Sequence, residues 1–338
     1  MRLRFALAAL GVMLAAGAAQ AQSVEEFYRK NQLSVYVGSG AGGGFDEIAR
    51  VFAQHFVKHI PGNPTPIVKN MPGAGGLLNV NFMYQQAPRD GSAIAAPFNT
   101  VFMLPVFGDP AAKFDSREFT WIGSLDKQTA TCMVWHTSKI MTIEDAKKSD
   151  VQVSATGVNA TPAIFPSMLN AFLKTRFKVI SGYSTTEMRL ALERGEVEGI
   201  CGLAWQTLKA VVPGWIAEKK IRPLLQMGLV PHPELQGVPL AADVISDPVE
   251  RQIFELVVLP QEFGRPFMAP PGVPKDRAEA LQRAFELTLK DPAFLADAAK
   301  IRLSLDPLRG GEILALLEKA YKAPKDVVAR AAKFSAGQ

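Results

Sequence analysis

Cysteine and histidine are scarce in this sequence, which limits the kinds of site that it can build. The 338 residues include two cysteines and four histidines. The cysteines do not form a cluster with the spacing of a zinc site. His55 and His59 are four residues apart in a predicted helix, but no carboxylate lies between them, so we interpret them as surface or edge histidines of that helix. The sequence therefore predicts no metal site.

The two cysteines, Cys132 and Cys201, each lie in a strand-like run, residues 131–135 and 197–201. An oxidising compartment permits a disulfide between two adjacent strands. Two buried thiols are the alternative, because free cysteine is commonly buried in a core. We favour the disulfide, but the sequence leaves both arrangements open.

Long apolar runs are absent after the first residues of the chain. Arg2 and Arg4 precede an apolar segment from Phe5 to Ala18, and Ala19-Gln20-Ala21 matches an A-x-A cleavage site. A membrane anchor is the alternative, but this run is short for a bilayer span. We therefore predict a signal peptide over residues 1–21, cleaved near Ala21, and an exported, periplasmic protein.

Clusters of lysine and arginine are absent as well. The formal net charge of +5 falls to +3 when Arg2 and Arg4 are removed with the signal peptide. A mildly basic chain without a basic cluster lacks the electrostatic footprint of a nucleic-acid-binding protein. Nucleic acid is therefore not an expected partner.

Motifs of nucleotide-binding enzymes and of hydrolases are incomplete or missing. Gly38-x-Gly40-x-x-Gly43 matches the dinucleotide fingerprint, but the second strand ends Val68-Lys69-Asn70 and lacks the acidic residue that the fingerprint needs. No Gly-Lys-Ser/Thr follows a glycine-rich segment, and no G-x-S-x-G elbow is present. We therefore expect no cofactor and assign no catalytic residue.

Glycine is abundant at the start of the first predicted helix. A predicted strand over residues 33–37 leads into Gly38-Ser39-Gly40-Ala41-Gly42-Gly43-Gly44, and an amphipathic helix follows. Glycines leave few side chains to obstruct a ligand, and a helix N-terminus offers free N–H groups and a positive dipole end. We interpret the loop as an anion site built from backbone. Asp46, in the first turn, would support the helix N-terminus or contact the ligand.

A second unit of the same kind follows directly. Residues 66–69 are a predicted strand, residues 70–76 (NMPGAGG) form a second glycine loop, and residues 77–87 are a predicted helix. A third strand over residues 93–96 leads to Asn99-Thr100. Such units predict a parallel sheet whose strands end at one edge, where open α/β sheets bind ligands. The alternative, that the glycines only make turns, is less consistent with two such loops side by side.

The rest of the chain is predicted to form a second α/β half followed by helices. Strands are predicted near residues 151–155, 177–180 and 221–227, and a strand-like run lies at residues 256–259. Helices between residues 275 and 334 are expected to cover the first half. The predicted domains are residues 22–123 plus 253–338 for the first and 124–252 for the second.

Polar and aromatic residues of the second half have two interpretations each. Thr156, Asn159 and Thr161 precede a predicted helix, so they would either cap it or face the glycine loops across a cleft. Tyr183 and Trp205 stand where strands end or helices begin. They would either pack in the core or form a cleft wall against the carbon skeleton of a ligand.

Four segments together resemble a known family, the periplasmic solute-binding subunit of tripartite tricarboxylate transporters, also called the Bug receptors. Each segment alone is weakly diagnostic, but together they are specific, and the resemblance covers essentially the whole chain after the signal peptide. The segments are GAGGGFDEIAR at residues 40–50, NMPGAGG at 70–76, GEVEG at 195–199 and MAPPGVP at 268–274.

The resemblance implies an α/β, two-domain Venus-flytrap fold of the type II periplasmic binding protein kind. It also implies that a small carboxylate is held between the domains, with one carboxylate group gripped by the two first-domain loops through backbone N–H groups and waters. With the residues discussed above, the predicted ligand-binding set is Ser39, Ala41, Gly42, Gly43, Gly44, Gly73, Ala74, Gly75, Gly76, Asn99, Thr100, Thr156, Asn159, Thr161, Tyr183 and Trp205.

The chain departs from the family pattern in three places. The first loop begins Gly38-Ser39-Gly40 where the family has a proline-rich start. Residues 180–184 read ISGYS in place of a valine-proline-tyrosine-lysine-glycine run, and residues 202–205 read GLAW where an aspartate is often found. The resemblance therefore does not define what binds the distal end of the ligand, and Tyr183 and Trp205 would suit an apolar or aromatic acid.

These observations predict a receptor and not an enzyme. We expect a monomer that captures a small organic carboxylate, closes its domains around it and delivers it to the permease subunits of a tripartite tricarboxylate-type transporter. Two alternatives remain. One is a periplasmic hydrolase or isomerase that uses Asp46 with a histidine, and the other is a binding protein that docks on a sensor.

Overall fold

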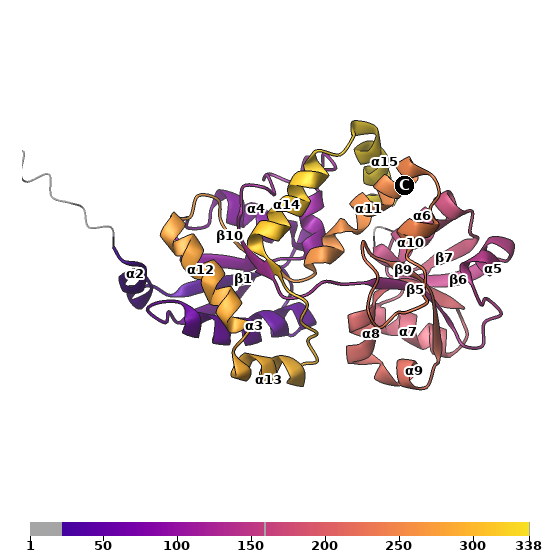
Figure 1. The fold of residues 1–338 in the computed structure, drawn as a ribbon, viewed down its shortest axis with the longest axis horizontal. Helices are drawn as coiled ribbons and strands as arrows, with labels where there is room; N and C mark the ends of the chain where they lie inside the picture. Colours follow the sequence, from indigo (N-terminus) through magenta and orange to yellow (C-terminus); the bar gives the residue numbers. More distant parts are fainter. Residues whose placement is uncertain (1–21, 159, 338) are drawn as a thin grey trace, which may run out of the picture.

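The computed structural model describes residues 22–158 and 160–337. Figure 1 shows two α/β halves, each built on one sheet. The predicted signal peptide, residues 1–21, lies outside the described residues, and so does Asn159. Among the described helices, none combines the length and the apolar character needed to cross a membrane.

The first sheet has six strands in the order β11-β4-β10-β3-β1-β2. β1 (Leu33–Val37) lies between β2 (Pro66–Asn70) and β3 (Ala93–Ala96) and runs parallel to both. The three parallel strands predicted from the sequence are therefore confirmed, and their carboxyl ends meet at one edge. The antiparallel strands are β10 (Pro266–Ala269), β4 (Thr120–Ser124) and β11 (Leu308–Arg309).

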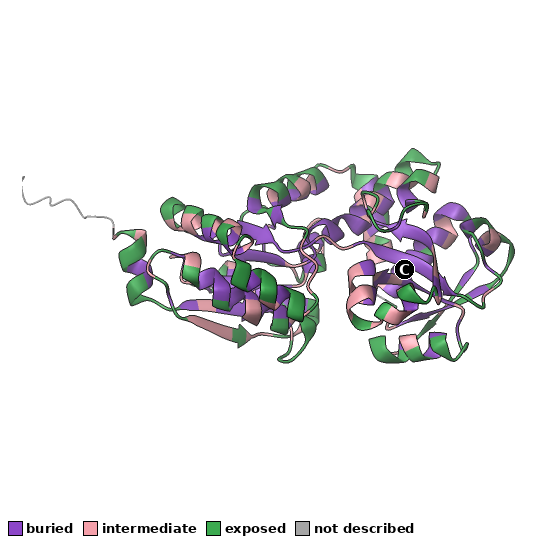
Figure 2. Ribbon diagram, turned by 60° about the horizontal axis from the view of Figure 1, so that its bottom comes forward, coloured by how far each residue is buried: buried purple, intermediate pink, exposed green. Residues whose placement is uncertain are grey.

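Helices cover both faces of the first sheet. Successive side chains of a strand point to opposite faces, and Val35 and Tyr36 accordingly belong to two different buried clusters. Figure 2 shows the strands buried at the centre and the outer helix faces exposed. Helices of the first face are α2 (Val24–Lys30), α3 (Gly44–Phe56), η1 (Val57–His59), α12 (Lys275–Thr288) and α13 (Pro292–Lys300), and those of the second are η2 (Ala74–Gly76), α4 (Leu77–Gln85), η3 (Asn99–Met103) and α14 (Gly310–Tyr321).

The second sheet has five strands in the order β7-β6-β8-β5-β9 and repeats the arrangement of the first. In each sheet the first strand of a parallel trio lies between the second and the third, and an antiparallel strand from another part of the chain follows the third. The strands are β5 (Ala130–Trp135), β6 (Val151–Ala155), β7 (Phe177–Ser181), β8 (Gly199–Ala204) and β9 (Ile221–Met227). The fold class predicted from the sequence, α/β with two domains, is confirmed.

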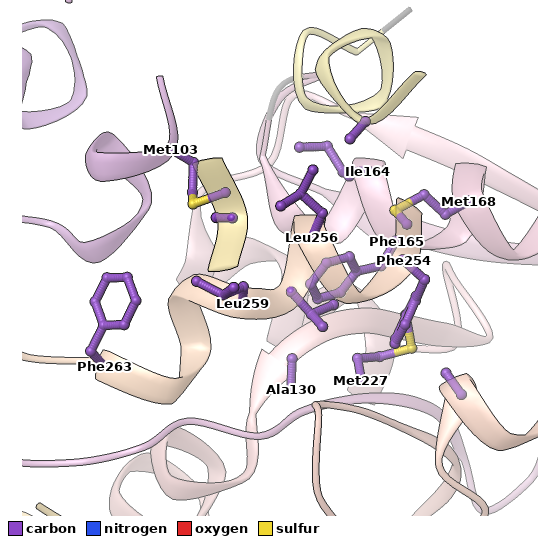
Figure 3. Close-up of a cluster of buried hydrophobic side chains, with 14 of the residues drawn as sticks. Met103, Ala130, Ile164, Phe165, Met168, Met227, Phe254, Leu256, Leu259 and Phe263 are labelled. Carbon is purple, nitrogen blue, oxygen red and sulfur yellow. The ribbon is translucent and has the colours of Figure 1, made fainter. Parts of the chain in front are cut away.

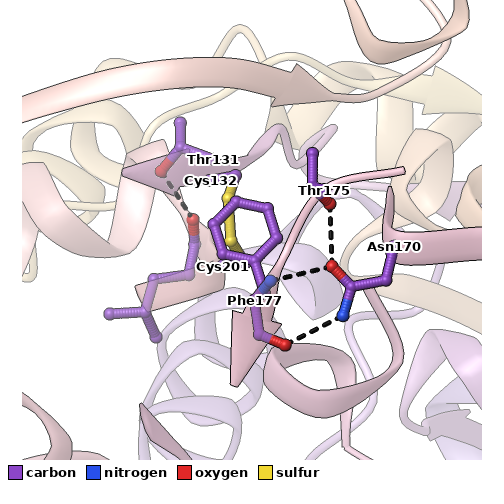
Figure 4. The surroundings of a disulfide bond; sticks show 7 residues. Thr131, Cys132, Asn170, Thr175, Phe177 and Cys201 are labelled. Atoms are coloured by element: carbon purple, nitrogen blue, oxygen red, sulfur yellow. Dashed lines mark hydrogen bonds between the residues drawn. A yellow bond between two sulfur atoms is a disulfide. The ribbon is translucent and has the colours of Figure 1, made fainter. Parts of the chain in front are cut away.

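A disulfide joins β5 to β8 in the second sheet (Figure 4). Cys132 and Cys201 are partners in the antiparallel pair, their Cα atoms are 3.8 Å apart, and both are fully buried. Of the two arrangements that the sequence left open, the structure contains the disulfide. Beside it, Asn170 of α6 (Thr161–Leu173) accepts hydrogen bonds from Thr175 and Phe177, which fixes the chain where β7 begins.

The run at residues 256–259, predicted as a strand, is helical, so that prediction is wrong. α11 (Pro248–Val258) begins at Asp247, whose carboxylate accepts the N–H groups of Val249 and Glu250. A short apolar run has the same pattern in a strand and in a buried helix, and here the N-cap decides. Figure 3 shows Leu256 and Leu259 among buried side chains.

The other elements of this half are η4 (Leu259–Phe263), α5 (Ile143–Lys148), α7 (Thr185–Glu193), α8 (Trp205–Val211), α9 (Pro213–Ala217) and α10 (Ala241–Val244).

The last helix, α15 (Lys325–Ser335), packs on α11 and α6 of the second half. Its Phe334 lies edge-on to Phe172 of α6, with ring centres 5.2 Å apart, and Arg330 lies 3.8 Å from Glu250 of α11. The tail was predicted to cover the first half, and this is wrong for α15. The amphipathic helix could be recognised from the sequence, but its apolar stripe does not say which partner buries it.

The chain crosses between the halves at residues 124–130, at residues 259–266 and again between α14 and α15. The first two of these segments are hydrogen-bonded to each other. The N–H of Gly264 donates to the carbonyl oxygen of Asp126 over 2.9 Å, and the N–H of Gln128 donates to that of Gln261 over 2.7 Å. The Asp126 carboxylate is buried and pairs with Arg265. Burial raises the pKa of Asp126 to about 7, although Arg265 opposes the shift. We call this pair of segments the crossing.

Candidate functional site

The two glycine loops lie side by side at the carboxyl edge of the first sheet. The first, residues 38–43, joins β1 to α3, and the second, residues 71–76, joins β2 to α4. The N–H of Met71 donates to the carbonyl oxygen of Val37 over 2.8 Å, so the second loop leaves β2 directly beside the end of β1. The predicted proximity of the loops is therefore a feature of the structure.

The second loop requires unusual backbone conformations. Gly73, Ala74, Gly75 and Gly76 all have positive φ, with values of 138°, 46°, 64° and 93°. Glycine adopts such values without strain, whereas Ala74 is held there at a cost. A side chain at Gly76 would also approach the ring of Phe98 within 3.0 Å. These glycines are needed for the shape of the loop, which turns sharply into α4.

A polar network centred on Asp46 holds the first loop in place through hydrogen bonds. Asp46 is buried, and its Oδ2 accepts the N–H of Gly42 over 2.8 Å. The side chain of Arg50, one turn along α3, donates to both carboxylate oxygens over 2.9 and 3.0 Å. Asn70, the last residue of β2, donates to Oδ1 of Asp46 over 2.8 Å and to the carbonyl oxygen of Ser39 over 3.0 Å.

The network fixes the charge of Asp46. Arg50 lowers the pKa of the Asp46 carboxyl to about 2, with smaller contributions from Gly42 and Asn70, although burial opposes the shift. Every oxygen of the ionised carboxylate is thus occupied by the protein. Of the two interpretations of Asp46, support of the loop and helix start is the one that the structure favours.

The backbone amides of the two loops divide into two groups. Those of Gly42 and Gly76 are occupied, by Asp46 and by the carbonyl oxygen of Gly73 respectively. Within the described residues, the amides of Ser39, Gly40, Ala41, Gly43, Gly44, Gly73, Ala74 and Gly75 have no acceptor. Gly42 and Gly76 therefore shape the loops, and the second group offers N–H donors to a ligand.

The end of the third strand completes this edge. The Phe98 ring lies 4.6 Å from that of Phe45, in the first turn of α3. Asn99 is buried, and its side chain donates to the carbonyl oxygen of Pro260 over 2.6 Å, whereas Thr100 is exposed. Asn99 therefore links the site to the crossing instead of offering its amide group to a ligand in this conformation.

The candidate residues of the second half gather at the matching edge of the second sheet. Tyr183 follows β7, and its N–H donates to the carbonyl oxygen of Ala155, directly before Thr156. Thr161 begins α6, where its hydroxyl lies 3.4 Å from the carbonyl oxygen of Gly202. Asn159 lies outside the described residues. In this conformation no hydrogen bond among the described residues joins this edge to the glycine loops.

Trp205 is part of the core of the second half. It is buried, its N–H donates to the carbonyl oxygen of Thr129, and its indole N–H donates to Glu234 over 2.9 Å. The core-packing interpretation therefore fits Trp205 in this conformation. Tyr183 is only half-buried and lines an open groove of about 350 Å³ beside α7, so it remains accessible to a ligand.

The histidine pair connects two helices. Nε2 of His55 lies 2.9 Å from Asp297, and Nε2 of His59 lies 3.0 Å from Asp291, both at α13. His55 is buried, contrary to the prediction of surface or edge histidines, because α13 covers it. No group of three or more potential metal ligands occurs in the described part of the chain. These contacts tie α13 to α3 through His55 and to η1 through His59.

Sequence reasoning missed Arg50 and Asn70. Arg50 stands four residues after Asp46, the spacing of an ion pair on one helix face, and this signal was present. Asn70 was visible as the residue between β2 and the second loop, but only the parallel pairing of β1 and β2 places it beside Ser39.

Comparisons with known proteins agree with this architecture. No family model matches the chain. A "UPF0065 protein in gbd 5'region" of Cupriavidus necator is 27% identical over 305 residues, which cover 87% of this chain and 84% of that protein. A TctC solute-binding protein from Polaromonas, solved without ligand, has a TM-score of 0.70 at 19% identity over 90% of this chain and 99% of its own.

Two further structures extend the comparison. The periplasmic binding protein BugD has a TM-score of 0.59 at 20% identity and covers 90% of this chain and 96% of its own. MatC of Rhodopseudomonas palustris, solved with bound malate, has a TM-score of 0.61 at 18% identity. The match covers 88% of this chain and 99% of MatC. The fold is therefore that of a two-domain periplasmic binding protein. Within this class its neighbours are the TctC and Bug solute-binding proteins, which confirms at the level of the fold the resemblance found in the sequence.

Proposed function

We propose that the protein is a periplasmic receptor that captures a small organic carboxylate between its domains. It then delivers the acid to the permease of a tripartite tricarboxylate-type transporter. The observation that carries the proposal is the pair of glycine loops, joined by Asn70 and offering N–H groups without an acceptor. Backbone N–H groups at a helix N-terminus form strong, charge-assisted hydrogen bonds with a carboxylate.

We propose the ligand residues from their positions at the carboxyl edges of the two sheets. We propose that Ser39, Ala41, Gly43, Gly44, Gly73, Ala74 and Gly75 supply amides, while Gly42 and Gly76, whose amides are occupied, shape the loops. Thr100, Thr156, Asn159, Thr161 and Tyr183 are proposed to complete the site when the domains close. The malate bound to MatC, a protein of the same fold, is consistent with a ligand of this class.

Domain closure is the proposed mechanism of capture. A ligand favours the closed form only by the contacts that it makes in that form and lacks in the open one. The crossing is the place for the hinge, because residues 124–130 and 259–266 carry the chain between the halves. Asn99 connects the ligand edge to this crossing through Pro260, so the two are mechanically linked.

The groups that an enzyme would need are occupied in structural roles. Asp46 is ionised and bonded to Arg50, Asn70 and Gly42. His55 and His59 bind α13. A binding function uses the backbone instead, which is why we prefer it to a hydrolase or isomerase.

Thermal shift measurements with a panel of carboxylic acids test the proposal, with a turnover assay on the same acids. A ligand that binds the folded form stabilises it and so raises the melting temperature. At a ligand concentration of 100 times Kd, the free energy of unfolding increases by about 2.7 kcal/mol. We expect a rise with at least one acid and none with its methyl ester, without turnover. Turnover of an acid, or no shift with any acid, would contradict the receptor.

A further inference from the structure

Asp126 carries a carboxylate that is buried where the chain crosses between the halves. Its side chain is 1% exposed, and its Oδ2 pairs with Arg265 in the other segment of the crossing. Oδ1 is buried without a hydrogen-bond partner and packs against the backbone of Gly264. Burying a charged oxygen without a donor costs free energy. The ionised form of Asp126 therefore depends on Arg265.

The backbone around this pair is fixed by hydrogen bonds that do not involve the carboxylate. The carbonyl oxygen of Asp126 accepts the N–H of Gly264 over 2.9 Å and the hydroxyl of Ser124 over 3.0 Å. The same hydroxyl accepts the N–H of Arg265 over 3.1 Å. Asp126 and Arg265 therefore stay next to each other when the carboxyl group gains or loses a proton.

Arg265 extends from the crossing to the first glycine loop. Its guanidinium carbon lies 5.5 Å from the ring centre of Phe45, and both side chains line one small pocket beside Pro97. Phe45 directly follows Gly44, whose amide is one of the free donors. Arg265 thus lies between a buried acid and the loop at which the carboxylate of the ligand is proposed to bind.

Asp126 titrates near neutral pH. Burial raises its pKa to about 7; Arg265 opposes the rise, and the negative charge of Asp306 adds to it. Asp306 lies beside the crossing, since its backbone N–H donates to the carbonyl oxygen of Leu125 over 3.2 Å. Arg265 and Asp306 are the charged groups that act on Asp126.

Two further titratable groups lie near Asp306. Glu262, in the crossing, is buried and lies 4.0 Å from Lys127, and burial raises the pKa of its carboxyl group. Burial lowers the pKa of His232, although the charges of Glu234 and Asp306 oppose this. Glu262 and His232 are therefore the neighbours from which an effect of Asp126 has to be distinguished.

We propose that ligand binding is coupled to the uptake of a proton by Asp126. This rests on the proposed function. A carboxylate at the first glycine loop brings a negative charge to the vicinity of Phe45, where it attracts Arg265 and weakens the hold of Arg265 on Asp126. Asp126 then binds a proton more tightly in the complex than in the free protein. Because linkage is reciprocal, protonation of Asp126 increases the affinity for the ligand.

The coupling fixes the sign of the pH dependence. At a pH above the pKa of Asp126 in the complex, Asp126 is ionised in both forms, and the affinity has its lower value. At a pH below the pKa in the free protein, Asp126 is protonated in both forms, and the affinity has its higher value. Two charges about 10 Å apart in a partly buried site change each other's proton affinity by up to about tenfold. The affinity should therefore rise by up to about tenfold as the pH falls through neutrality.

Isothermal calorimetry between pH 6.5 and pH 9 tests the coupling. The probe is whichever of malate, adipate, hexanoate and benzoate gives the largest thermal shift, since all four are ionised in this range. The Kd of the wild type should be about 3- to 10-fold lower at pH 6.5 than at pH 9. Binding enthalpies at pH 7.5 in HEPES and in Tris, which differ in ionisation enthalpy, should differ by the amount expected for proton uptake.

Asp126→Asn should bind at pH 6.5 about as tightly as the wild type and should lose both the pH dependence and the proton uptake. The amide resembles the protonated acid but does not titrate. Glu262→Gln and His232→Gln are the matched controls and should keep both properties. Asp306→Asn leaves the buried pair intact and, at low salt, should move the midpoint of the pH profile to lower pH. Melting temperatures establish that each variant is folded.

Four results would overturn the proposal and leave the receptor function standing. The first is a wild-type Kd that is constant over this range or lower at pH 9. The second is a pH profile that survives in Asp126→Asn, and the third is one that disappears in Glu262→Gln or His232→Gln. The fourth is an unmoved midpoint in Asp306→Asn. If none of the four acids binds the wild type at any pH, the receptor function fails and the inference fails with it.

Discussion

The side chain of Asn70, at the end of β2, donates a hydrogen bond to the carbonyl oxygen of Ser39, in the loop after β1, over 3.0 Å. The same amide group donates to Asp46 over 2.8 Å. One side chain thus holds the first glycine loop, the start of α3 and the end of β2 in a fixed relation. The free N–H groups of the two loops are positioned before any ligand arrives, so less ordering is needed on binding.

Replacing Asn70 by alanine should weaken ligand binding about tenfold, because the loops must then be ordered by the ligand. Calorimetry with the acid that gives the largest thermal shift measures this. Asn170→Ala is the matched control, since Asn170 also bonds two chain segments but lies by β7. It should reduce stability and leave Kd unchanged. Equal Kd values for Asn70→Ala and the wild type would contradict the bracing role.

Asp46 should give the protein a stability component that disappears in acid. Its pKa is about 2 in the folded protein and about 3.9 in an unfolded chain, so the stabilisation is present above pH 4 and is lost as the pH falls toward 2. The component is at most about 2.6 kcal/mol. Urea unfolding between pH 5 and pH 2.5 should show a smaller loss of stability for Asp46→Asn than for the wild type.

Asp145→Asn is the control for Asp46. The pKa of Asp145 is also lowered, by hydrogen bonds from the N–H groups of Met141 and Thr142, but it caps α5. Like Asp46→Asn, the variant Asp145→Asn should lose less stability in acid than the wild type does. Asp145→Asn should leave ligand affinity unchanged, whereas Asp46→Asn should lower it. An acid profile of Asp46→Asn identical to that of the wild type would show that the carboxylate is not stabilised as described.

Gly202 should not tolerate a side chain. Its φ is +119°, and a Cβ would lie 2.8 Å from the backbone nitrogen of Pro162 at the start of α6. Strain and overlap should cost Gly202→Ala about 2–4 kcal/mol of unfolding free energy. Gly157→Ala, where a Cβ meets nothing within 4 Å, should change stability by less than about 0.5 kcal/mol in urea unfolding. Equal stabilities of the two variants would refute this explanation of Gly202.

Removing Arg265 should destabilise the crossing by about 3 kcal/mol, because the buried Asp126 carboxylate then lacks its partner. The pKa of Asp126 should rise further, so Arg265→Met should lose more stability at pH 8 than at pH 5. Arg117→Met removes an exposed partner of Asp115 and should cost less than about 1 kcal/mol. Urea unfolding at the two pH values measures both. A pH-independent loss in Arg265→Met would contradict the buried ion pair.

The parts of the fold that local sequence defines were predictable. The spacing of apolar residues and the glycine content predict a strand before each glycine loop, the loop itself and a helix after it. The structure has β1, β2 and α3 at these places. The parallel pairing that brings the loops together also followed, because β-loop-α units favour one sheet edge.

What depends on tertiary contacts was not predictable. The segment at 256–259 is helical because Asp247 caps α11, and α15 packs on α6 and α11 because the chain crosses between the halves. At the site, sequence reasoning treated all loop amides as equal. The occupation of the Gly42 amide by Asp46 depends on how the loop folds back over α3, and no local pattern records this.

The most direct test of the account is an NMR titration of the protein labelled with ¹⁵N in alanine and glycine. The titrant is the acid that raises the melting temperature most. The account predicts that the amide signals of Ala41, Gly44, Ala74 and Gly75 shift together toward the positions of strongly hydrogen-bonded N–H groups. The signal of Gly91, which precedes β3 at the opposite edge of the sheet, should not move. Saturable binding that leaves those four signals in place would contradict it.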